Sequence, residues 1–438
     1  MSLNEGWSRW VVLAVLVSSS TGCGRSEKPP VEYGTLPGLR QTHEARLREE
    51  LCRLEAEKAT PVLLDGADRA AEVQELLERI LPRQRLALAL RRVEKLYPRG
   101  AFEFDPVGLE QMLLVREQLD GVLRQYRAVF DSDEFRFEVS FVAGLLADLS
   151  FVDHARLVHR LEAMDAARPL VAGRLHEAIA PLERMFRIDA RLAAVRHVVP
   201  RLAGAELRAE TLRVLEAVVQ HPQCTAALQR RCLQLLRAQL ADWPSDALVW
   251  IGDRAVGLHA YEMVRSGDVL SLLTLQEIRE KRERMELDAF VRAMTTSVDA
   301  DELFYLQAMR QLIEACDEPF HVRKKTLEAI GDRLRLLEKT PRYPLFAATV
   351  LLPDMTEGHQ AQAEDRARCE AWAIVLAAAA DGAVPAFETN PVSGQPYRIA
   401  RDDRQVEVSE IDGPSGGETA RARIAGVARG AAADRPRR

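Results

Sequence analysis

Apolar residues recur at three- and four-residue steps along most of the chain, which is the pattern of an α-helix with one buried face. The clearest example begins at Asp105-Pro106, where an N-cap residue precedes a first-turn proline. Its apolar stripe consists of Leu109, Met112, Val115, Leu119, Val122, Tyr126 and Phe130. A second helix is predicted after Asp299, because Glu302 lies three residues on in a capping-box arrangement.

Helical patterning extends over residues 38–382, and it includes a helix predicted near 134–149. Short proline-containing breaks separate the helices at 220–222, 243–245 and 318–319. Such short connections favour packing of successive helices as antiparallel neighbours. We therefore predict a mainly α fold, either a multi-helix bundle or an irregular helical array, and a subdivision near residue 243 stays open.

The period changes near the carboxyl end, in the turn-rich segment 383–418. Residues 396–401 and 404–409 alternate in polarity on either side of Asp402-Asp403, which predicts a short β-hairpin. An isolated hairpin is marginal in water, so we expect Tyr397 or Val406 to dock on the apolar helix at 371–380. Residues 419–438 are rich in Arg, Ala and Gly and predict a disordered tail.

The amino terminus has the three-part layout of a secretory signal peptide over residues 1–22, with an apolar run at 10–17. Residues 20–23, Ser-Thr-Gly-Cys, resemble the lipobox of bacterial lipoproteins. The resemblance implies cleavage before Cys23 and attachment of a diacylglyceryl group to its sulfur. A plain secretory signal cut near Gly22 and a buried first helix are the alternatives.

Residues 23–37 are rich in Pro, Gly and charged residues, a composition typical of a flexible tether. By the lipoprotein convention, Gly24 is not the aspartate that retains a protein at the inner membrane. The resemblance therefore implies a lipid-anchored protein of the cell envelope, at the outer membrane facing the periplasm. A lipid anchor of this kind holds a protein on a membrane without a transmembrane helix.

Composition excludes some function classes. The 438 residues include 60 Lys+Arg and 66 Asp+Glu, a net charge of -6, with 47% hydrophobic and 29% charged residues. This is ordinary globular composition. Because nucleic-acid binders concentrate positive charge, we expect no nucleic-acid partner.

Common catalytic and metal-binding motifs fail on inspection. No lysine follows a glycine, so a phosphate-binding G-x-x-x-x-G-K loop is absent from the sequence. The fourth residue after His176 of His176-Glu177 is Ala180, and that after His43 is a leucine, which excludes the zinc-protease motif. His154 and His159 would point about 140° apart on one helix. With Glu162 they are therefore predicted to be solvated or interhelical polar residues and not metal ligands. No cofactor is expected.

Ser415 lies in a G-x-S-x-G match at 413–417, but no strand-turn-helix surrounds it, so we expect no catalytic role. The cysteines are Cys23, Cys52, Cys224, Cys232, Cys316 and Cys369. A disulfide between Cys224 and Cys232 requires Cys224 to lie in the loop after Pro222, because one helix would hold the two about 12 Å apart. Buried free thiols are the alternative for both.

The string 390–417, with its N-P-x-S-G-x-P-Y opening, hairpin and closing Asp-Gly and Gly-Gly pairs, resembles the carboxyl-terminal segment of major pseudopilins. The same segment ends many uncharacterised exported bacterial proteins. The long apolar amino-terminal helix of a prepilin is missing, so the resemblance is to the helix-rich envelope proteins and implies no activity. Of the calcium ligands known in pseudopilin loops, Asp412 is the one candidate here.

Two functions remain as hypotheses. The first is a non-catalytic, membrane-tethered scaffold or interaction module, whose partners are the membrane, through the lipid on Cys23, and an unidentified envelope protein. The second is an exported hydrolase or lyase that uses scattered carboxylates and histidines. A deep pocket with clustered acids of perturbed pKa would favour the enzyme, and a pocketless body with an exposed apolar groove would favour the interaction module.

Overall fold

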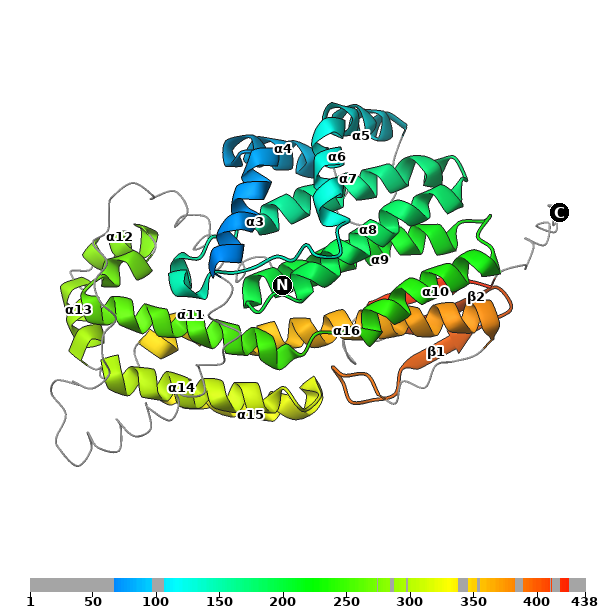
Figure 1. The fold of residues 1–438 in the computed structure, drawn as a ribbon. Helices are drawn as coiled ribbons and strands as arrows, with labels where there is room; N and C mark the ends of the chain where they lie inside the picture. Colours follow the sequence, from blue (N-terminus) through cyan, green and yellow to red (C-terminus); the bar gives the residue numbers. More distant parts are fainter. Residues whose placement is uncertain are drawn as a thin grey trace, which may run out of the picture.

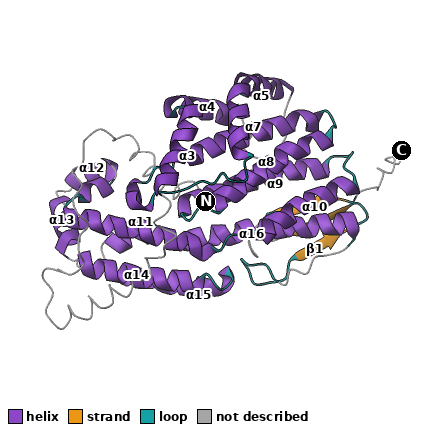
Figure 2. Cartoon of the chain, in the orientation of Figure 1, coloured by secondary structure: helices purple, strands orange, loops and turns teal. Residues whose placement is uncertain are grey.

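The computed structural model describes residues 67–96, 106–273, 275–283, 287–296, 298–337, 346–352, 355–382, 389–409, 411 and 418–424. The predicted signal peptide, the tether and Cys23 lie outside these ranges. Within them the fold is mainly α-helical, as predicted, with a small sheet at one end (Figure 2).

Four helices form the first layer: α3 (Ala67–Ile80), α4 (Arg83–Leu96), α5 (Pro106–Gln118) and α6 (Asp120–Phe130). They pack on a stack of three long antiparallel helices, namely α7 (Phe151–Val171), α8 (Leu175–Ala193) and α9 (Val198–Gln220). In Figure 1, α4 and α5 lie at the top of the molecule above α7. The short connections between the long helices produce this antiparallel arrangement.

The rest of the body is built from α10 (Ala226–Ala241), α11 (Asp246–Ser266), α12 (Leu275–Glu283), α13 (Leu287–Thr296), α14 (Val298–Ala315), α15 (Phe320–Leu337) and α16 (Met355–Asp381). Two 3-10 helices, η2 (Phe141–Leu146) and η3 (Val269–Leu272), and a π-helix, η4 (Ala347–Leu351), complete the helical elements described. Helix α16 runs along the middle of the molecule (Figure 1).

The predicted helix near 134–149 is wrong. Residues 136–140 form no helix, and only η2 follows them. The reason is that Phe135, Phe137 and Val139 are buried at every second position, which is the period of an extended chain.

The carboxyl-terminal hairpin is present and is extended by a third strand. Strands β1 (Arg398–Arg401), β2 (Gln405–Ser409) and β3 (Thr419–Arg423) form an antiparallel sheet in the order β1-β2-β3. Strand β3 corrects the prediction that residues 419–438 are disordered throughout, because Ala420 and Ala422 are buried. Residues 425–438 lie outside the described ranges.

The sheet docks on α16, as expected. Tyr397 donates a hydrogen bond to Glu370 Oε2 at 2.8 Å, and Val406 is fully buried. Val406 belongs to the core cluster that the apolar run of α16 shares with α8, α9 and α10.

The buried side chains form three clusters. The first joins α8, α9, α10, α16 and the sheet, and the second joins α11, α14, α15 and η4. The third lies between α3–α6 and α7. Helix α16 contributes to the first two clusters, and the loop at 243–245 leads from α10 in the first to α11 in the second.

Candidate functional site

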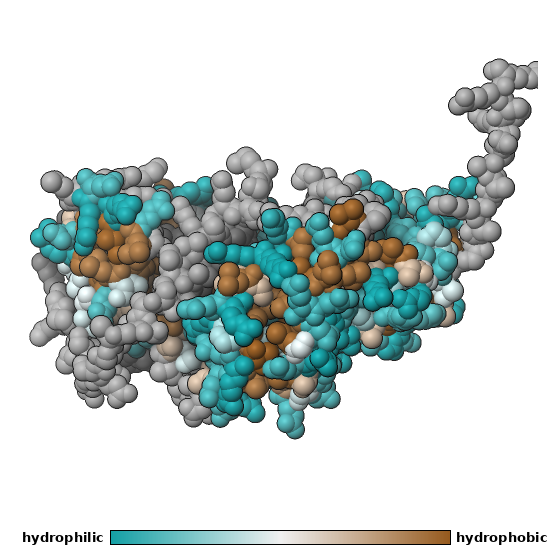
Figure 3. All heavy atoms as spheres, turned by 90° about the horizontal axis from the view of Figure 1, so that it is seen from above, coloured by the Kyte–Doolittle hydropathy of each residue, from teal (hydrophilic) through white to brown (hydrophobic). Residues whose placement is uncertain are grey.

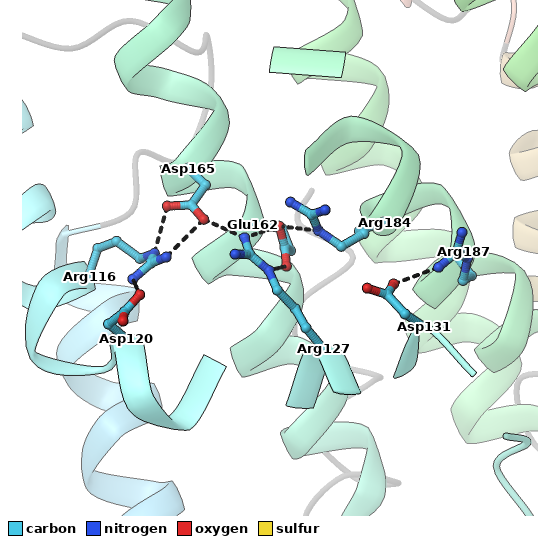
Figure 4. Close-up of polar contacts among 8 residues, drawn as sticks. All are labelled: Arg116, Asp120, Arg127, Asp131, Glu162, Asp165, Arg184 and Arg187. Carbon is cyan, nitrogen blue, oxygen red and sulfur yellow. Dashed lines mark hydrogen bonds and ion pairs between the residues drawn. The ribbon is translucent and has the colours of Figure 1, made fainter. Parts of the chain in front are cut away.

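The most extensive group of charged side chains lies where α5 and α6 meet α7 and α8 (Figure 4). Glu162 of α7 is fully buried and accepts hydrogen bonds from Arg127 Nε at 2.6 Å and from Arg184 Nε at 2.9 Å. One turn on, Asp165 accepts from Arg116 Nε at 2.6 Å and also pairs with Arg127. We call these five residues the ion-pair network. It joins four helices through bonds with charged partners at both ends.

The ion-pair network stabilises the charged form of its arginine side chains. Burial by itself lowers the pKa of the Arg127 guanidinium, but its hydrogen bonds and charge interactions with Glu162 and Asp165 raise that pKa above its ordinary value. The same balance raises the pKa of Arg116. Because an arginine does not release a proton near neutral pH, Arg116 and Arg127 remain positively charged partners in these ion pairs.

A second polar group lies in the core between α7, α8 and α9. His159 Nε2 lies 2.8 Å from Thr211 Oγ1, which in turn lies 2.6 Å from Asp189 Oδ2. All three side chains are fully buried. Burial lowers the pKa of His159 to about 3 and raises the pKa of Asp189 well above its ordinary value. Burial therefore favours the uncharged form of both the imidazole and the carboxyl group.

The residue types of this group are those of a hydrolase, but its geometry is not. In a catalytic triad the two ring nitrogens contact different partners, one the nucleophile and the other the acid. Here Nε2 of His159 faces both Thr211 and Asp189, the latter at 3.3 Å, while Nδ1 lies 3.7 Å from Glu210 Oε2, which is too long for a hydrogen bond. No substrate can contact these side chains, because none of them has exposed surface.

The residues His154, His159 and Glu162, close together in the sequence, belong to separate contacts. His154 shares a hydrogen bond with the Tyr126 hydroxyl, His159 contacts Thr211, and Glu162 is held by arginines. Across the residues that the structure describes, no three His, Cys, Asp or Glu side chains come together so as to hold a metal ion.

A small cavity lies beside the amino terminus of α9. Its volume is ≈ 30 Å³, and its lining includes His197, Asp253, Tyr305, Gly144 and Gly257. A water molecule needs about 10–15 Å³ on this measure. The cavity therefore accommodates one or two waters and excludes an organic substrate.

The polar groups of the cavity are engaged with the backbone. His197 Nδ1 accepts the Val199 N–H at 3.1 Å as the N-cap of α9, and the Asp253 carboxylate accepts the Val198 N–H. Burial raises the pKa of Asp253 to about 7 and lowers the pKa of His197 to about 4. Both side chains therefore satisfy amide donors at the start of a helix.

Gly257 makes room for the third polar group of the cavity. A Cβ at this position would lie 2.2 Å from the Tyr305 hydroxyl oxygen. Because glycine has no Cβ, the Tyr305 hydroxyl can approach α11 and donate to the Asp253 carbonyl oxygen at 3.2 Å. A glycine in the middle of a helix lowers stability by about 1 kcal/mol relative to alanine. The presence of Gly257 inside a predicted helix was therefore the sequence signal for this close approach.

The loop after α10 inserts Trp243 between two arginines of α9. The guanidinium carbons of Arg201 and Arg208 lie 5.3 and 4.7 Å from the centre of its ring. Arg201 also donates to Asp246 at 3.2 Å, and Arg323 of α15 donates to the same carboxylate at 2.8 Å. These contacts connect the first core cluster with the second.

The two cysteines of the candidate disulfide are present as thiols in the structure. Cys224 lies in the loop before α10, where the pairing requires it, yet Cys224 and Cys232 are both free thiols. Burial raises their pKa values to about 11 and about 12, so both thiols are protonated at neutral pH. A protonated thiol does not react readily to form a disulfide.

The remaining predicted residues are Cys23, Cys52, Asp412 and Ser415, which lie outside the described residues. No helix in the described part of the chain is both long enough and apolar enough to cross a bilayer. The chain matches no protein-family model, no curated protein and no solved structure.

Proposed function

We propose that the protein is a membrane-tethered interaction module of the bacterial cell envelope and that it is not a catalyst. The observation that carries this proposal is the enclosure of the polar group around His159 and of the polar cavity beside α9. His159, Asp189 and Thr211 have no exposed surface, and His197 and Asp253 line a cavity of water size. What the molecule presents to solvent instead includes helix faces with exposed large apolar side chains.

The alternative, an exported hydrolase or lyase, needs acids and histidines that a substrate can reach. Besides the small cavity, the structure has an open groove of ≈ 340 Å³ between α8 and α10. Its floor includes Ile179 and Leu228, and its titratable groups are His176, Glu183 and Arg231. Glu183 accepts a hydrogen bond from Arg231 at 3.1 Å. The carboxylate of this groove is therefore already engaged by Arg231. This engagement favours the non-catalytic proposal.

The tethering part of the proposal places a lipid on Cys23 and the body at the outer membrane, facing the periplasm. Its support is the apolar run at 10–17, the lipobox-like residues 20–23 and the tether composition of 23–37. Several acyl chains on one residue bury many methylenes, each contributing about 0.8 kcal/mol. One modified residue is then sufficient for stable anchoring.

The test is intact-mass measurement and fractionation of the protein from its native membrane. We expect loss of residues 1–22, added acyl mass, and release or stalled processing in Cys23→Ala. The matched control is Cys52→Ala, which should remain lipidated and membrane-bound. Wild-type protein that is soluble, begins near Cys23 and carries no lipid would refute the anchor.

A further inference from the structure

The outward face of α4 is basic around one exposed leucine. Leu88 is 67% exposed, and the exposed side chains near it are Arg85, Arg91, Arg92 and Lys95. None of these four makes an ion pair with another described residue. The single acid near the end of α4, Glu94, pairs with Arg160 at 2.7 Å instead.

The outward face of α5 has the opposite charge. Val107 is 62% and Leu114 is 52% exposed, and the two lie one heptad apart. Glu110 and Glu117 are exposed beside them, and no ion pair joins either to a described residue. This face is therefore acidic around two aliphatic side chains.

The two helices lie side by side on α7 and contact each other, so both outward faces are on the same side of the molecule (Figure 1). Seen from that side, apolar residues form brown areas among hydrophilic ones (Figure 3). We call the exposed side chains of α4 and α5 the α4–α5 face. Within one molecule its bases and acids form no ion pair with each other among the described residues.

We propose that the α4–α5 face binds a second copy of this chain, with α4 of each copy lying on α5 of the other. A two-fold axis makes this contact self-complementary, because the basic helix meets the acidic helix twice. The spacing fits such packing. Gln84, Leu88, Arg91 and Lys95 follow one another at steps of four, three and four residues.

The facing helix has the matching pattern. Val107, Glu110, Leu114 and Glu117 follow at steps of three, four and three residues, so the exposed side chains of both helices repeat at the spacing that places them on one face. An anionic bilayer would attract α4 but repel the two glutamates of α5. A second copy satisfies both helices and is therefore the occupant that the charges favour.

Self-association of this kind should be weak and reversible. Each helix is about 20 Å long, so the face falls in the small class of interfaces, below about 1,200 Å² in total. Attachment to one membrane would raise the effective concentration of the copies. The inference names the partner of the proposed interaction module and rests on that proposal, but it does not require the lipid anchor.

The test uses charge reversal in the full chain carrying Cys23→Ala, analysed by sedimentation velocity without detergent. We expect the wild-type face to give a concentration-dependent dimer. Arg91→Glu with Lys95→Glu should weaken it at least about tenfold, and so should Glu110→Lys with Glu117→Lys. Equimolar mixing of the two variants should restore dimers, because each reversed face then meets its opposite.

The matched control is Arg168→Glu with Arg237→Glu, which reverses two exposed arginines on α7 and α10 and should leave dimerisation unchanged. A monomeric wild type, reversal variants that still dimerise, or a mixture that stays monomeric would each overturn the inference. Monomers whose binding to phosphatidylglycerol vesicles is lost on reversal of α4 and strengthened on reversal of α5 would assign the face to the membrane. A monomeric wild type that is lipidated at Cys23 would refute the dimer and leave the anchor intact.

Discussion

Glu162 is the residue whose replacement tests the ion-pair network most directly. Glu162→Gln preserves the shape of the side chain but removes the charge that Arg127 and Arg184 share, and it places an amide NH2 against arginine donors. Removing one partner of a buried ion pair costs about 3–5 kcal/mol. Both arginines are 24% exposed and Arg127 keeps Asp165, so we expect about 3 kcal/mol, the lower end of that range.

The assay is urea unfolding followed by circular dichroism, with hydrogen exchange by mass spectrometry to locate the change. Exchange should accelerate first in α5 and α6, which the network joins to α7 and α8. The matched control is Asp131→Asn, which breaks the neighbouring pair with Arg187, 43% and 41% exposed (Figure 4). An exposed pair contributes at most about 1 kcal/mol. If Glu162→Gln cost no more than Asp131→Asn, the network would not stabilise the layer, and the reasoning would be refuted.

Two further predictions concern the sheet and the cavity. Tyr397→Ala should destabilise the protein by about 2 kcal/mol, less than the 3–5 kcal/mol measured for a fully buried aromatic. Tyr397→Phe should destabilise it by less, because only the hydrogen bond to Glu370 is lost. Equal urea midpoints for the wild type and both variants would contradict the docking contact. The pKa of Asp253 is about 7 when folded and about 4 when unfolded, so the folded state holds an extra proton between these values and its stability falls as pH rises from about 4 to about 7. Asp253→Asn should show a smaller decrease, because the raised pKa of Asp189 still contributes one of the same sign. A variant with the unchanged wild-type pH dependence of the urea midpoint would show that Asp253 does not contribute to it.

Apart from the helix expected near 134–149, the sequence predicted the mainly helical fold of the described residues, because the apolar stripes are long and regular. The stripe from Leu109 to Phe130 belongs to α5 and α6, although the chain bends near Leu119, which is the N-cap of α6. Strand β3 was missed because its inward residues are Ala420 and Ala422. Alanine is a poor strand signal and a good helix former.

The candidate site was beyond prediction from the sequence. His159 reaches Thr211 and Asp189, which lie on two other helices, and nothing local to any of the three residues indicates the contact. The same is true of Glu162, whose arginine partners are 35 and 22 residues away. Buried polar partners depend on how helices are rotated against each other, which the periodicity of one helix does not specify.

The position of α16 has a consequence for the order in which the chain can fold. Arg208 of α9 pairs with Asp365 of α16, 157 residues later, and α16 packs on α9 and α10. During synthesis α9 and α10 remain without this partner until residues 355–381 have been made, and contacts so distant in sequence form slowly. A chain that cannot complete two of its three core clusters until residues 355–381 are made leaves those two clusters unfolded while it is synthesised. For a protein exported as we propose, this delay would help to keep the chain unfolded and competent for translocation until it has crossed the inner membrane.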